Sequence, residues 1–240
     1  MAGFQVSIGA INDVSDRDHD AVAQPWKAIP SGRVSLRTAR SVAVGGASVG
    51  ILASLLLGPA TLAVGLMGLA IGVAYDLGLK RTAWGWLCFA VALPLVPVFA
   101  WLGAGAGLPP QVATLFLLGG LAGTELAIAN GLVDAPGDGQ LGARGIAIRL
   151  GPGPARATMA AAGIGVLAVA WLSLSGPGGA VGSSQGSGAI VLGLLSGSVL
   201  LAAGVVMSLR QDATWAWRGW QVQAVGIAAV ALVWLAATSS

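Results

Sequence analysis

WGWLCFAVALPLVPVFAWLGA, residues 84–104, is an apolar run without a charged side chain. At about 1.5 Å of rise per residue, a helix of this length spans the roughly 30 Å hydrocarbon core of a bilayer. The sequence therefore predicts an all-α protein, a polytopic transmembrane helical bundle with seven full spans. Six further runs of comparable character complete it, at 41–57, 60–75, 111–130, 155–174, 188–209 and 216–237.

The composition excludes an ordinary soluble domain. Hydrophobic residues make up 56% of the 240 positions, and charged residues only 9%. Residues 1–12 are also apolar, but a helix of that length covers only about 18 Å. We expect them to be the end of a span whose beginning is missing, within one transmembrane domain covering residues 1–240. No signal peptide is indicated, since no basic segment precedes this run and no small-residue cleavage site follows it.

The positions of the charges predict the topology. All twelve Lys and Arg residues lie in four segments, whereas the intervening connections carry no charge. By the positive-inside rule these segments face the cytoplasm, so we expect a protein of the cell inner membrane with its chemistry on the cytoplasmic side. Since the basic residues form no face outside these loops, no nucleic-acid partner is expected. The four segments are 17–40, 76–83, 131–156 and 208–218.

NDVSDRDHD, residues 12–20, concentrates charge where the first apolar segment ends. Helical residues four apart lie one turn apart on the same face, so Asn12, Asp16 and Asp20 are predicted to form one row. His19 and Asp18 fall outside this row and are expected to face solvent. The same spacing returns where a later span reaches the cytoplasmic side, in Asn130, Asp134 and Asp138.

Two carboxylate rows at one bundle mouth predict a cation site. Crowded carboxylates repel one another unless a cation lies between them, and hard oxygen ligands favour Mg²⁺, which completes its shell with water and phosphate oxygens. A membrane cavity below such a site suits an isoprenyl diphosphate, with its charged head and hydrocarbon tail. Candidate partners of the phosphate oxygens are Lys27, Arg33, Tyr75, Lys80, Arg81, Arg144 and Arg149.

These segments resemble the UbiA superfamily of intramembrane prenyltransferases. NDVSDRDHD matches the first aspartate motif of that family, and PWKAIPSG at 25–32 is similar to its Arg-Pro-Ile-Pro-Ser-Gly segment. YDLGLKR at 75–81 is similar to its Tyr-x4-Lys loop, and NGLVDAPGDGQLGARGIAIRLG at 130–151 to its second aspartate motif. The order and spacing of these motifs cover nearly the whole chain.

The resemblance implies a bundle of nine spans that transfers a prenyl group to an acceptor with the help of Mg²⁺. Ionisation of the C–O bond would give an allylic cation, which an unidentified lipophilic or aromatic acceptor captures. Asp16 and Asp134, central in each row, are the expected catalytic carboxylates. Carried over by motif position, the metal ligands are Asn12, Asp16, Asp20, Asn130, Asp134 and Asp138, and the diphosphate ligands are Lys27, Tyr75, Lys80 and Arg144, joined by the neighbouring Arg81.

The chain departs from the family pattern at three places. The family has a full first span and a complete second one before the first motif, whereas only eleven residues precede Asn12 here. Pro136 and Gly137 interrupt the second row, and a proline there is expected to end or kink the helix and displace Asp138. Gly145 stands where the family has a hydroxyl residue.

Glu125 is the single acid placed within a span, and acids inside membranes are functional candidates. We expect it to line the acceptor pocket and to help remove the proton lost on prenylation. The nine tryptophans are expected to be mostly interfacial anchors.

Two alternatives stay open at this point. Carboxylates at a bundle mouth also mark ion paths, so an ion-coupled transporter or a cation-binding membrane protein could carry the same rows. The other alternative is a truncated family member without catalysis. Taken alone, NDVSDRDHD could be a solvated helix end, but its recurrence at matching spacing argues against that interpretation.

Overall fold

The computed structural model describes residues 1–140, 144–176, 180–182, 187–210 and 212–238, and throughout these ranges its regular elements are helical. The expectation of an all-α protein is confirmed. The elements are α1 (Ala2–Ser15), α2 (Arg17–Ala23), α3 (Leu36–Leu57), α4 (Pro59–Leu77), η1 (Leu79–Arg81), α5 (Gly85–Gly103), α6 (Val112–Gln140), α7 (Ile146–Leu150), α8 (Pro152–Ser175), η2 (Ala180–Gly182), α9 (Ser187–Ser208) and α10 (Ala213–Thr238).

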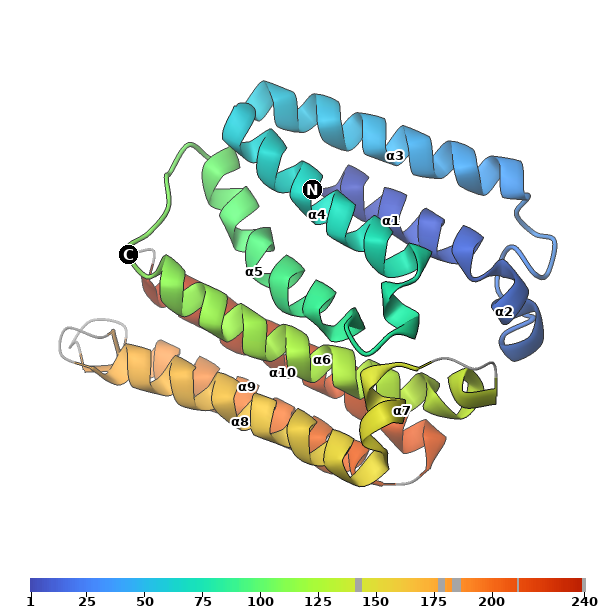
Figure 1. Ribbon diagram of the computed structural model, residues 1–240. Coiled ribbons are helices and arrows are strands. Elements are labelled where there is room, and N and C mark those ends of the chain that lie inside the picture. The colour runs from blue at the N-terminus through green and yellow to red at the C-terminus, as the bar shows by residue number, and fades with distance from the viewer. Residues whose placement is uncertain (141–143, 177–179, 183–186, 211, 239–240) are drawn as a thin grey trace.

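Seven of the described helices are long and apolar enough to cross a membrane: α3, α4, α5, α6, α8, α9 and α10. They coincide with the seven runs predicted from the sequence. The helices form two groups joined by α5, which packs on α4 on one side and on α6 on the other. In Figure 1 the short elements α2, η1 and α7 lie at the same end of the bundle. They carry Asp20, Lys80 and Arg81 of the predicted site.

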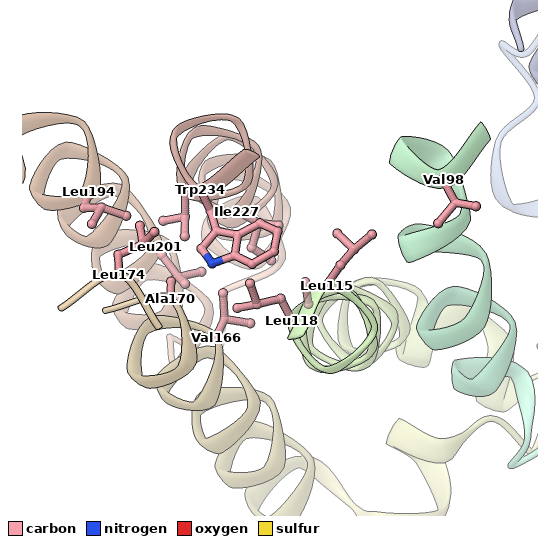
Figure 2. Packing of buried hydrophobic residues seen from close by; sticks show 12 residues of the cluster. Val98, Leu115, Leu118, Val166, Ala170, Leu174, Leu194, Leu201, Ile227 and Trp234 are labelled. Atoms are coloured by element: carbon pink, nitrogen blue, oxygen red, sulfur yellow. The ribbon is translucent and has the colours of Figure 1, made fainter. Parts of the chain in front are cut away.

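The core of the second group is built around Trp234 of α10, which is 1% exposed. Figure 2 shows its indole between side chains of α6, α8 and α9, among them Leu118, Val166 and Leu201. Its Nε1 donates a hydrogen bond to Ser173 Oγ at 2.9 Å, so the buried indole N–H is satisfied. The expectation of interfacial tryptophans is therefore wrong for Trp234, because that indole is a core residue with its own acceptor.

In the first group, α1 packs on α3 and α4 through glycines. Phe4 of α1 is 1% exposed, and its ring lies over Gly50 of α3 and Gly65 of α4. Small residues let membrane helices approach closely, which compensates for the weak hydrophobic driving force between helices in lipid. This packing fixes α1, and with it the start of the first aspartate row.

Gly46→Ala is expected to destabilise this helix pair, because a Cβ on Gly46 would lie 2.8 Å from Gly3 O and 2.9 Å from Ser7 N. Backbone atoms would have to shift, and overpacking of this kind costs about 1–3 kcal/mol. Gly45→Ala is the matched control, since no atom lies within 4 Å of its added Cβ. Thermal unfolding in detergent should show a lower Tm for Gly46→Ala only. Equal Tm values for the two variants would contradict this packing.

Candidate active site

The first aspartate row lies across the junction of α1 and α2, with Asp16 between the two helices. The backbone hydrogen bonds continue through the junction: Asp16 N–H donates to Asn12 O at 2.9 Å, and Asp20 N–H donates to Asp16 O at 2.7 Å. The four-residue repeat is therefore preserved although the helix is interrupted. Asn12, Asp16 and Asp20 consequently line one cavity.

This polar cavity, of about 410 Å³, also receives the second row. Asn130 and Asp134 of α6 line it, and Asn130 Nδ2 donates a hydrogen bond to Asp134 Oδ2 at 3.1 Å. The structure thus brings together five of the six residues predicted as metal ligands. The side chain of Asp138 lies outside the described residues. Helix α6 continues to Gln140, so of the two effects expected of Pro136, an end or a kink, the end is wrong.

Lysine and arginine side chains compensate the carboxylates of the first row. Lys80 Nζ lies 2.6 Å from Asp16 Oδ2 and 2.8 Å from Asn12 Oδ1. Arg81 Nη2 lies 3.4 Å from Asp16 Oδ1, and Lys27 Nζ donates to Asp20 Oδ2 at 2.9 Å. Because Asp20 is only 2% exposed, its charge needs such a partner. The predicted diphosphate ligands Lys27, Lys80 and Arg81 all line the polar cavity.

The segment that places Lys27 is held by local hydrogen bonds. Arg33 Nη2 donates to Trp26 O at 2.5 Å, and Arg33 Nε donates to Ser31 Oγ at 3.0 Å. Ser35 then caps α3 by accepting a hydrogen bond from Thr38 N–H. Arg33 therefore stabilises the loop instead of lining the cavity, which corrects the expectation that it meets phosphate oxygens.

The structure separates Arg144 and Arg149 from the other predicted cations. Both side chains are exposed, and neither lines the polar cavity. Arg144 N–H donates to Arg81 O at 2.9 Å, so the backbone of this segment still docks against the η1 turn. Gly145 does line the cavity, at the position where a hydroxyl side chain was expected by analogy.

An apolar cavity of about 460 Å³ adjoins the polar one between α1, α4 and α5. Asn12, Tyr75 and Phe89 line both cavities and so form their boundary. The rings of Tyr75 and Phe89 pack edge to face, with centroids 5.2 Å apart. Gly68 and Gly72 of α4 belong to the wall of the apolar cavity. The structure thus joins a charged compartment to a hydrocarbon-like one.

Glu125 is correctly predicted as an acid within a span, but it does not reach either cavity. Its side chain is fully buried beside Gly163 of α8, near Val205 of α9. Neither carboxylate oxygen has a hydrogen-bond partner among the described residues. Glu125 therefore lines neither cavity, because α6 directs this side chain towards α8 and α9. Its role at an acceptor pocket stays a prediction.

The positions of three side chains near the site were not predicted correctly from the sequence. His19 lines the polar cavity, with its Nδ1 3.9 Å from Asp20 Oδ1, instead of facing solvent. Trp217 and Trp220 stack at 5.2 Å between ring centroids and also line this cavity.

Asp18 is exposed as expected, and the hydrogen bond from Arg17 holds the pKa of its carboxyl below the usual value.

The donor set of the polar cavity fits Mg²⁺. It consists of carboxylate and amide oxygens, and Mg²⁺ commonly binds one or two carboxylates while water and substrate phosphate complete its octahedral shell. Within the described part of the chain, no three His, Cys, Asp or Glu side chains gather closely enough to hold a metal by themselves. The two rows therefore suit a metal that is shared with a phosphate ligand, rather than a closed structural site.

Comparison with known proteins gives a consistent result. A model of the UbiA prenyltransferase family matches residues 1–224. Digeranylgeranylglyceryl phosphate synthase of Methanopyrus kandleri is 36% identical over 147 residues, covering 61% of this chain and 54% of that protein. The bacteriochlorophyll synthase 34 kDa chain of Chloroflexus aurantiacus is 29% identical over 168 residues, covering 68% and 54%. The chain thus spans about half the length of these curated relatives.

Two solved structures share the fold. The apo structure of a UbiA homologue from Aeropyrum pernix K1 aligns with a TM-score of 0.76 at 18% identity, over 96% of this chain and 84% of that one. A UbiA homologue from Archaeoglobus fulgidus bound to GPP and Mg²⁺ aligns with a TM-score of 0.68 at 16% identity, over 96% and 83%.

Proposed function

The chain belongs to the UbiA prenyltransferase family, and on that premise we propose that it transfers a prenyl group from an isoprenyl diphosphate to a lipophilic or aromatic acceptor within the membrane. One observation carries the proposal: a cavity lined by two aspartate rows and three cations adjoins an apolar cavity and shares three lining residues with it. A diphosphate head fits the first compartment and its hydrocarbon tail fits the second. The match between this bipartite space and a bipartite substrate supports the assignment.

The aspartate rows would hold Mg²⁺ on two sides of the diphosphate. Asn12, Asp16 and Asp20 would serve one side, and Asn130 and Asp134 the other. When bound, Mg²⁺ would neutralise the negative charge that grows on the departing diphosphate. The UbiA homologue from Archaeoglobus fulgidus, which shares this fold, is bound to GPP and Mg²⁺, and this supports the choice of metal.

Basic and aromatic side chains of the protein would stabilise the leaving diphosphate and the allylic cation. Lys27, Lys80 and Arg81 are placed to donate to phosphate oxygens and so stabilise the leaving group as the C–O bond breaks. Tyr75 and Phe89, at the boundary of the cavities, would flank the allylic cation, and the apolar walls would keep water from capturing it. The acceptor then forms the new bond with the cation and releases a proton.

The same arguments orient the protein. Seven apolar helices and the family make it an integral membrane protein. We propose that the polar cavity opens to the cytoplasm, because α2, η1 and α7 lie in the basic segments. We also propose that residues 1–240 act as one transmembrane domain, since α5 packs against both helix groups.

Gly68→Leu is expected to restrict the length of the prenyl tail. No atom lies within 4 Å of a Cβ at Gly68, so the new side chain can enter the apolar cavity without a backbone clash. We expect geranylgeranyl diphosphate to bind about tenfold more weakly while geranyl diphosphate binds unchanged, because each buried CH₂ that is displaced forfeits about 0.8 kcal/mol. Competition binding measures both Kd values.

The control for Gly68→Leu is Gly45→Leu, which adds the same side chain on the exposed face of α3. It should leave both Kd values unchanged. Equal weakening of the two diphosphates by Gly68→Leu would show that the tail does not enter the apolar cavity.

The proposed activity is tested by product analysis in lipid nanodiscs. Labelled geranylgeranyl diphosphate and Mg²⁺ are supplied with a glyceryl phosphate ether lipid, a chlorophyll-type alcohol or a phenolic acid as acceptor. We expect acceptor-dependent release of diphosphate and one prenylated product. No product with any acceptor, combined with ion flux in proteoliposomes that does not depend on prenyl diphosphate, would instead support the transporter.

A further inference from the structure

Asp76 is a buried acid beside the site that the proposed chemistry does not use. It is the penultimate residue of α4 and is 4% exposed. Its Oδ1 lies 3.7 Å from Lys80 Nζ, and its Oδ2 has no hydrogen-bond partner within the described ranges. It also lines the apolar cavity next to Tyr75. A nearly buried carboxylate with an oxygen that accepts no hydrogen bond is costly, so its presence here calls for a role.

Lys80 occupies the position that a metal ion needs. Its Nζ lies 2.6 Å from Asp16 Oδ2 and 2.8 Å from Asn12 Oδ1. Mg²⁺ binds oxygen at about 2.0–2.1 Å, and two cations cannot share these oxygens at such distances without strong repulsion. Binding of Mg²⁺ to Asn12 and Asp16 therefore requires Lys80 to move.

Asp76 is the acid best placed to receive the displaced ammonium group. It precedes Lys80 by four residues, and the two charged atoms are already 3.7 Å apart. Asp20, the buried carboxylate of the first row, is already paired with Lys27 at 2.9 Å. A small rotation of the Lys80 side chain would replace its contacts with Asp16 by a hydrogen bond to Asp76.

We propose that Asp76 is a positioning residue that receives Lys80 when a divalent metal takes Asn12 and Asp16. The inference rests on the proposed function, because it presumes a metal at the first aspartate row. Asp76 acts through Lys80 and touches neither the metal nor the reacting atoms. The exchange keeps Lys80 beside the polar cavity that it lines, where its ammonium group can then donate to the diphosphate.

The test is a double-mutant cycle on Mn²⁺ binding, measured as loss of the free Mn²⁺ EPR signal in nanodiscs without substrate. The variants are Asp76→Asn, Lys80→Gln and the combination of both. Asp76→Asn removes a negative charge near the metal in either background, so its direct effect cancels in the cycle. Asp76→Asn should raise the Kd for Mn²⁺ in the presence of Lys80, and this rise should be about tenfold larger than the rise in the Lys80→Gln background. A coupling of this size is typical of residues in contact.

Asp76→Glu keeps the experiment decisive if the asparagine variant folds poorly. Glutamate retains the carboxylate, so the affinity for Mn²⁺ should stay within a few-fold of wild type. The coupling between residue 76 and Lys80 should persist when Asp76→Glu is combined with Lys80→Gln. An equal effect of Asp76→Asn in both backgrounds would overturn the exchange while leaving the metal site intact. Failure of the wild type to bind Mn²⁺ without substrate would overturn the exchange. Failure to bind it with a diphosphate analogue present as well would also overturn the proposed function.

Discussion

Asp16→Asn is expected to lower the rate of prenyl transfer by about three orders of magnitude, near the upper limit for removing one stabilising group from a polar active site. Asp16 is the central residue of the first row, and it is contacted by both Lys80 and Arg81. The amide would keep the shape of the side chain but lose the charge that attracts a metal. Steady-state release of diphosphate, with Mg²⁺ in excess, measures the effect.

The matched control is Asp18→Asn, two residues further along the chain. Asp18 is exposed and pairs only with its neighbour Arg17 among the contacts that the structure describes. This variant makes the same chemical change outside the polar cavity, so its turnover should equal that of wild type. Equal losses in both variants would show that the charge of this segment matters in general, and not the row that Asp16 occupies.

Asp134→Asn is expected to reduce turnover about a hundredfold and to raise the Mg²⁺ concentration needed for half-maximal rate. Asp134 is the described carboxylate of the second row, and Asn130 orients it through a hydrogen bond at 3.1 Å. Loss of a group that only orients a metal ligand typically costs about 10–100-fold in metal affinity or activity, and loss of the ligand itself should cost at least as much. A Mg²⁺ titration of the rate separates weaker metal binding from slower chemistry.

Asp212→Asn is the control for the second row. Asp212 is exposed before α10, where its Oδ1 accepts hydrogen bonds from Thr214 N–H and Trp215 N–H. Asparagine can make the same cap, so neither the rate nor its Mg²⁺ dependence should change. If Asp134→Asn behaved like this control, the second row would have no part in metal binding.

The membrane fold could be predicted from the sequence because the bilayer imposes a length on each apolar run. The seven spans follow from that constraint alone, although α3 begins at Leu36 instead of residue 41. The early start includes Arg37 and Arg40, whose long side chains can reach the interface from within a helix. Side-chain packing could not be predicted in the same way. Hydropathy does not tell which apolar residues face lipid and which face the protein core, as the buried Trp234 shows.

The rows of the site were predictable because a four-residue repeat maps directly onto one helix face. Their charge compensation was not, because Lys80 and Asp16 are 64 residues apart in the chain. The burial of Asp76 is not predictable for a related reason: the apolar run in the sequence ends at residue 75, whereas α4 continues to Leu77 and buries the acid. For Glu125, the apolar run around it predicts a position within the membrane, but the neighbours of its side chain depend on tertiary packing.

The most direct test of the account is binding of a non-hydrolysable geranylgeranyl diphosphate analogue to the chain in nanodiscs, with and without Mg²⁺. Trp217 and Trp220 line the polar cavity and provide a fluorescence signal for its occupation. The account predicts saturable, Mg²⁺-dependent binding that is lost in Asp16→Ala and kept in Asp18→Asn. Binding that is absent at every Mg²⁺ concentration, or that survives in Asp16→Ala, would contradict the claim that the first aspartate row holds the diphosphate through a metal.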